Sequence, residues 1–75
     1  MKLTLQTLRN NGNVEFESIK PKSGMDCWDI YDNLKQKYSG EGYEKHLDLD
    51  NLDIKIFMAV ELETNDVYVV NLVMR

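Results

Sequence analysis

The chain has little of the residues that most often reveal a chemistry. Its 75 residues include one cysteine, one histidine and one proline. A lone cysteine excludes an intrachain disulfide, which is typical of proteins kept in a reducing compartment. No charged segment precedes a continuous apolar run at the start, and charged residues interrupt the apolar stretches elsewhere. We therefore expect neither export nor membrane insertion, and we predict a cytoplasmic location.

The scarcity of histidine and cysteine argues against an enzyme. A catalytic nucleophile needs a base within reach, and Cys27 lies on the apolar stripe of a predicted helix. No glycine-rich loop offers a cradle for phosphate. We predict no catalytic residues, no metal site and no cofactor.

One short segment resembles a metal site. His46, Asp48 and Asp50 would project from one side of a strand. The segment lacks the glycine of an EF-hand loop, and Ala59 occupies the place of its bidentate glutamate. A solvated acidic edge is the favoured interpretation, and metal-dependent hydrolysis around His46 and Asp48 is the least favoured functional alternative.

Basic residues are also in the minority. Thirteen acidic against nine basic residues give a net charge of −4, which opposes binding to a phosphate backbone. We predict no nucleic-acid partner. Asp26, Asp29 and Asp32 lie on the polar side of the predicted helix, where they can attract a basic partner surface or simply keep the protein in solution.

The sequence predicts two hairpins. In the last third, two apolar runs flank a three-residue turn at Thr64–Asp66. This turn predicts that one face of the hairpin is the core, formed by Ile54, Ile56, Met58, Val60, Leu62, Tyr68, Val70, Leu72 and Met74. Near the start, a two-residue turn at Asn10–Asn11 predicts that Leu5 faces Phe16.

A helix is predicted between the hairpins. Ser23 and Asp26 have the spacing of a capping box, and Gly40 supplies a stop. The apolar residues after the cap fall on one stripe at about 100° per residue: Cys27, Ile30, Tyr31, Leu34 and Tyr38.

The order hairpin, helix, hairpin predicts a single α+β domain over residues 1–75. Its expected architecture is a β-grasp-like ββαββ fold, with a mixed four-stranded sheet and one helix on one face. The first and last strands would lie parallel at the centre. For residues 39–53 we expect a short extra edge strand near 45–50, with a helical turn as the alternative.

Two segments carry a resemblance to a known family. Residues 1–8, Met-Lys-Leu-Thr-Leu-Gln-Thr-Leu, resemble the opening of ubiquitin, and Val67 to Arg75 are similar to its final strand. The chain ends at Arg75 without the Gly-Gly tail through which ubiquitin and sulfur carriers are activated. The resemblance to ubiquitin-like domains therefore implies binding through an open sheet face, without conjugation.

The residues point to the same surface. On the face away from the helix we expect an apolar cluster that binds a partner, formed by Leu8, Phe57, Ala59, Val69 and Val73. The predicted function is an acidic, non-catalytic protein-binding module, an inhibitor or adaptor of the kind that phages and other mobile elements encode. The alternative is a homodimer whose sheet faces pair.

Overall fold

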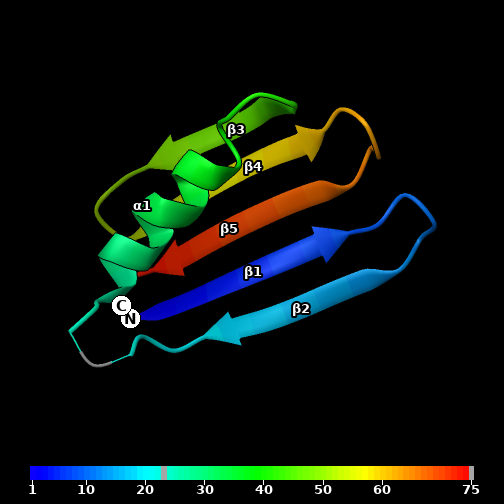
Figure 1. Ribbon diagram of the computed structural model, residues 1–75. Helices are drawn as coiled ribbons and strands as arrows, with labels where there is room; N and C mark the ends of the chain where they lie inside the picture. The colour runs from blue at the N-terminus through cyan, green and yellow to red at the C-terminus, as the bar shows by residue number, and fades with distance from the viewer. Residues whose placement is uncertain (23, 75) are drawn as a thin grey trace.

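The computed structural model describes residues 1–22 and 24–74. These residues form a sheet with one helix lying across one of its faces (Figure 1). In chain order the elements are β1 (Lys2–Leu8), β2 (Val14–Ile19), α1 (Cys27–Lys37), β3 (Tyr43–Asp50), β4 (Ile54–Glu61) and β5 (Val67–Val73).

The sheet has five strands in the order β2-β1-β5-β4-β3, and every neighbouring pair is antiparallel. The prediction of a mixed four-stranded β-grasp is therefore wrong. β1 and β5 do lie side by side, but Leu5 pairs with Val70 in an antiparallel register. The physical reason is the extra strand. Three strands follow α1 in place of two, and each hairpin reverses the chain, so the last strand runs opposite to the expected direction.

The extra strand occupies the segment where a short edge strand was expected. β3 is longer than predicted, with eight residues, and among the described strands it pairs with β4 alone. A bulge interrupts its register between Lys45 and Leu47. On the helix side, Asp48 forms an ion pair with Lys35 of α1 at 2.9 Å.

The first hairpin turns through three residues, one more than predicted. The backbone N–H of Arg9 donates to the carbonyl of Asn13 at 2.8 Å, and Gly12 between them has φ +93°. A type I turn closed by a left-handed residue is the usual three-residue loop, and glycine takes that position without strain. Leu5 therefore lies opposite Glu17, so the predicted pairing of Leu5 with Phe16 is wrong.

The second hairpin also differs from its prediction by one residue. Glu61 donates its backbone N–H to the carbonyl of Asp66 at 2.9 Å, so the loop is residues 62–65, with Asn65 at φ +63°. A slip of one residue moves every side chain of a strand to the other face.

The faces of β4 are consequently inverted. Phe57 and Ala59 point toward α1, whereas Ile56 and Met58 point away from it. The predicted core face was correct for β5, where Val70 and Leu72 are buried, and wrong for β4.

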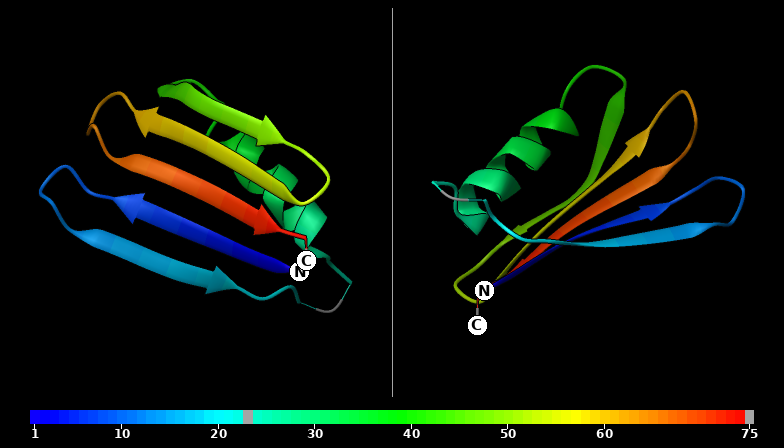
Figure 2. Two further views of the ribbon diagram at one scale, coloured as in Figure 1. Left: turned by 180° about the vertical axis from the view of Figure 1, so that it is seen from behind. Right: turned by 60° about the horizontal axis from the view of Figure 1, so that its bottom comes forward.

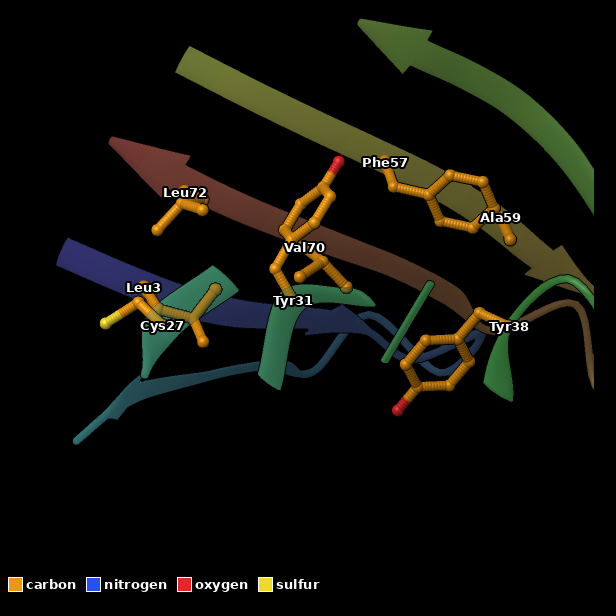
Figure 3. Close-up of a cluster of buried hydrophobic side chains, with 8 residues drawn as sticks. All are labelled: Leu3, Cys27, Tyr31, Tyr38, Phe57, Ala59, Val70 and Leu72. Carbon is orange, nitrogen blue, oxygen red and sulfur yellow. The ribbon is translucent and has the colours of Figure 1, made fainter. Parts of the chain in front are cut away.

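The core lies between α1 and the sheet (Figure 3). Its fully buried large side chains are Phe57, Leu3, Leu72 and Val70. The predicted helix stripe is confirmed, because Cys27, Tyr31 and Tyr38 are buried and Ile30 and Leu34 pack beside them. Tyr38 also stacks on Tyr68 of β5, with ring centroids 4.5 Å apart.

The start of α1 depends on Asp26. Its carboxylate accepts a hydrogen bond from the backbone N–H of Asp29 at 2.9 Å, which makes Asp26 the N-cap. Ser23, the other half of the predicted capping box, lies outside the described residues. The helix ends at Lys37, before Gly40. Lysines occupy its last turn, where their positive charge interacts favourably with the negative end of the helix dipole.

Candidate functional site

The candidate site is the face of the sheet opposite α1. Seen from behind, all five strands lie in front of the helix, and no helix among the described residues crosses them (Figure 2, left). In the right-hand view α1 lies wholly on the other side of the sheet (Figure 2). One layer therefore separates a packed side from an uncovered side.

The strand registers fix which side chains lie on this uncovered side, which we call the open face. They form rows across the strands from β2 to β3. The rows are Val14, Leu8, Val67, Val60 and Glu44; then Phe16, Gln6, Val69, Met58 and Leu47; then Ser18, Thr4, Asn71, Ile56 and Leu49; and finally Lys2, Val73 and Ile54.

Most side chains in the rows of the open face are apolar. Phe16 is 66% exposed and Val14 59%, although both belong to types that usually avoid water. At the opposite edge Leu47 and Leu49 are each 41% exposed. A continuous apolar surface that reaches across a whole sheet is far more than the scattered apolar residues of an ordinary surface, and such surfaces mark interaction sites.

The polar residues of the open face are few and grouped. Within the paired rows the charged residues are Lys2 and Glu44, both in outermost rows. The neutral polar residues adjoin one another on β2, β1 and β5: Ser18, Thr4, Gln6 and Asn71. Thr4 is buried, and the side-chain oxygen of Asn71 is buried with no hydrogen-bond partner in the described part of the chain.

The residues predicted to bind a partner divide between the two sides of the sheet. Leu8, Val69 and Val73 lie on the open face. Phe57 and Ala59 are 0% exposed and pack in the core, so their predicted placement on the open face is wrong. The inverted register of β4 is the cause.

Sequence reasoning missed most of the open face for the same reason. It assigned the outward residues of β4 to the core and paired Phe16 with the core residue Leu5. Gly12 was the available signal, because a glycine just after Asn10–Asn11 favours the three-residue loop with a left-handed last residue.

The predicted acidic cluster on α1 is partly structural. The Asp26 carboxylate caps the helix by accepting a hydrogen bond from the backbone N–H of Asp29. Asp29 and Asp32 are exposed on the outer surface of α1. This surface lies on the opposite side of the molecule from the open face (Figure 2). One partner surface of modest size therefore cannot cover both.

An ion network ties the two hairpin tips together. Asp66 accepts hydrogen bonds from the backbone N–H of Asn10 at 2.8 Å and from Arg9 at 3.1 Å. The Asn10 hydrogen bond and the Arg9 guanidinium lower the pKa of Asp66. Arg9 also pairs with Glu15 at 2.6 Å and lowers the pKa of that carboxyl. These carboxylates hold turns in place.

The predicted metal-like segment does not gather its side chains. Asp48 pairs with Lys35, and Asp50 lies 3.4 Å from the ammonium of Lys55. His46 follows Lys45 at the bulge and lies 3.9 Å from Glu44. Within residues 1–22 and 24–74, no three histidine, cysteine or acidic side chains form a grouping that could hold a metal ion.

A hollow of about 640 Å³ lies at the end of the sheet beside Trp28. Met1, Met74 and Leu52 contribute apolar lining, and Lys55 contributes a charge. The Lys55 ammonium lies 4.3 Å from the centroid of the Trp28 ring. Asp50 and the Trp28 ring already stabilise this cation. We therefore interpret the Lys55 contacts as part of the packing of the fold and not as a binding site.

Comparisons with known proteins identify no relative, since no protein-family model, no curated protein and no solved structure matches the chain. Among the described residues, no helix has the length and apolar character needed to cross a membrane. The open face is therefore interpreted from its own geometry.

Proposed function

We propose that this chain is a small non-catalytic interaction module that binds another protein surface through the open face of its sheet. The observation that carries the proposal is the apolar surface that extends from Phe16 on β2 to Leu49 on β3. Leaving such a surface in water is costly, at roughly 25 cal/mol for each Å² of apolar area. A protein partner removes that cost.

The chemistry of the remaining groups supports an interaction role. The Cys27 thiol is buried in the core, and Asp48, Asp50 and Asp66 each hold a basic side chain. These groups contribute to folding, and the large uncovered surface is apolar. A buried free thiol is also consistent with a reducing compartment, and we propose the cytoplasm as the location.

Two kinds of partner fit the open face. One is a different protein, as for an inhibitor or adaptor of a mobile element. The other is a second copy of this chain, the homodimer expected as an alternative, and the environment of Asn71 favours it. In both cases the outer surface of α1, with Asp29 and Asp32, stays free for secondary contacts with basic groups.

A matched pair of variants on β2 tests the open face. Phe16 and Glu17 are neighbours on the same edge strand, both are exposed, and they point to opposite faces. Phe16→Lys and Glu17→Gln each change the net charge by one positive unit. Each purified variant is immobilised, and the proteins it retains from a lysate of the source cells, together with untagged copies of itself, are compared with those retained by the wild type.

We expect Phe16→Lys to lose the proteins that the wild type retains, and Glu17→Gln to keep them. Asp29→Asn combined with Asp32→Asn tests the outer surface of α1 in the same assay. If that double variant loses the retained proteins while Phe16→Lys keeps them, the acidic helix is the binding surface and the proposed function is wrong.

A further inference from the structure

The open face has the size of a dimer interface. Strands lie about 4.8 Å apart and rise about 3.3 Å per residue, so a face of five strands with about seven residues each measures roughly 24 Å by 23 Å. The whole molecule extends 33 × 22 × 21 Å, so the open face occupies most of one side. Two such faces bury on the order of 1,000 Å² or more, which is what a specific interface requires.

The charge distribution favours contact between two copies on this face. Each copy carries a net charge of −4, so like charges oppose self-association wherever carboxylates gather. The carboxylates of Glu15, Asp48 and Asp50 lie on the helix side, and Asp29 lies on α1. On the open face the charged residues of the paired rows, Lys2 and Glu44, lie in outermost rows. Depletion of charge at the centre is typical of homodimer interfaces.

Asn71 is the feature that selects a second copy over a different protein. It lies on β5, the central strand, and interrupts the outward series Val67, Val69 and Val73. Asparagine is unfavourable in strands, and the buried oxygen of Asn71 has no partner in the described residues. Leaving such a group unpaired costs about 1–3 kcal/mol.

The side-chain amide of an asparagine can form hydrogen bonds with the same amide of a second copy. The side-chain amide has both an acceptor oxygen and two N–H donors. The oxygen is covered within the single chain, so the amide turns about χ2 to present it to a second copy. A two-fold axis maps every point on it onto itself. If the axis lies in the plane between the two sheets and passes Asn71, the Asn71 amides of the two copies meet there. This holds for any angle between the strands of the two sheets. Buried asparagines fix the register and the partner number of coiled coils in the same way.

We infer that a second copy of this chain covers the open face, sheet against sheet, with the two-fold axis passing Asn71. This inference rests on the proposed function and names the partner. The two copies then form a sandwich with a helix on each outer side, as aligned or orthogonal sheet packing allows. The apolar residues of β4 and β5 become its second core.

The first test is the mass of the purified wild-type chain by sedimentation velocity, from micromolar to millimolar concentration. We expect twice the 8.8 kDa of one chain. A mass of 8.8 kDa at millimolar concentration would overturn the inference. The proposed function would survive that result if Phe16→Lys still lost a different protein in the capture assay, and would fail with it if Phe16→Lys lost nothing.

The second test exploits the axis. With like charges facing each other away from water, Asn71→Asp and Asn71→Lys should each weaken self-association about a hundredfold or more. An equimolar mixture should recover a one-to-one complex, because the carboxylate then meets the ammonium. Asn33 is exposed on α1, so Asn33→Asp and Asn33→Lys are controls that should stay dimeric.

Circular dichroism establishes whether each variant is folded. If an Asn71 variant is unfolded, the mass of the wild-type chain alone decides whether the protein is a dimer. A dimer that both Asn71 variants leave unchanged would overturn the axis. A mixture that stays monomeric, although each variant is folded, would overturn it as well.

Discussion

Replacing Phe57 tests the inverted register of β4 most sharply. Phe57 and Phe16 are the two phenylalanines of the chain, and they lie on opposite faces of the sheet. Phe57 is 0% exposed beneath α1, whereas Phe16 is 66% exposed on the open face. The same substitution to alanine at both positions therefore compares a core residue with a surface residue.

The expected costs differ several-fold. Removing a buried phenylalanine to alanine typically costs about 3–5 kcal/mol. A chain of 75 residues has a total free energy of unfolding of roughly 4–11 kcal/mol, so Phe57→Ala removes a large part of it. At about 4–8 °C per kcal/mol the melting temperature should fall by at least about 12 °C. Phe16→Ala should change the free energy of unfolding of a single chain by no more than about 0.5 kcal/mol.

Urea unfolding followed by far-ultraviolet circular dichroism measures both variants. The comparison is made at low micromolar concentration, where dimer formation contributes least. It is repeated at high concentration, where Phe16→Ala should lose the part of the stability that comes from association. Equal costs for the two variants at low concentration would show that Phe57 and Phe16 are not divided between core and surface, and that the assigned register of β4 is wrong.

Three further predictions concern single groups. Tyr31→Phe should raise the free energy of unfolding by about 1 kcal/mol, because the buried Tyr31 hydroxyl has no hydrogen-bond partner in the described residues. Tyr68→Phe should lower it by about 1 kcal/mol, since the Tyr68 hydroxyl donates to Glu61 at 3.0 Å; urea midpoints that move in the same direction would contradict this pair. Burial raises the pKa of Tyr31 and of Tyr68 to about 12. For both tyrosines the folded-state pKa lies above the unfolded value of about 10. Their protonated hydroxyls therefore contribute to the free energy of unfolding below pH 10, and this contribution is lost as the pH rises toward 12. Ultraviolet absorbance should show the two rings ionising late, and ionisation of every tyrosine near pH 10 in the folded protein would refute the assignment. Asp66 has a lowered folded-state pKa, so its contribution is present above its unfolded pKa and is lost as the pH falls through the folded value. Asp66→Asn should therefore destabilise the protein at neutral pH and flatten its loss of stability in acid, and a stability curve identical to that of the wild type would show that Asp66 does not tie the turns.

The sequence was sufficient for the elements that depend on local patterns. The apolar stripe from Cys27 in α1 to Tyr38 at its C-cap packs in the core as predicted, because its spacing matches a helix. Both hairpins exist because polar turn residues separate apolar runs. The start of α1 was also correct in part, since Asp26 caps the helix, although the prediction gave the cap to Ser23.

The sequence was not sufficient for the strand registers. β4 is apolar on both faces, with Ile56 and Met58 on one and Phe57 and Ala59 on the other, so its pattern does not indicate which face is inside. Only the turn decides, and a loop of four residues instead of three inverts the strand. The surface assigned to partner binding therefore combined residues from both faces.

The predicted direction of the last strand was wrong for a different reason. Whether residues 43–50 form a strand decides the direction of β5, because each added strand reverses the chain. A short edge strand was expected near 45–50, but the segment supplies only Leu47 and Leu49 on its apolar side, so its pattern does not show that it forms a full hairpin with β4. Its pairing with β4 is a tertiary event that local propensity does not determine.

Solvent access to the methyl groups of β4 shows whether a second copy of the chain covers the open face. Methyl-labelled wild-type protein at millimolar concentration is titrated with a soluble paramagnetic probe, with Leu52, 95% exposed, as the reference. We expect the Ile56 and Met58 signals to stay as sharp as those of core residues while the Leu52 signal broadens. Broadening of Ile56 and Met58 equal to that of Leu52 would show that the purified chain leaves this face bare and would contradict the sandwich.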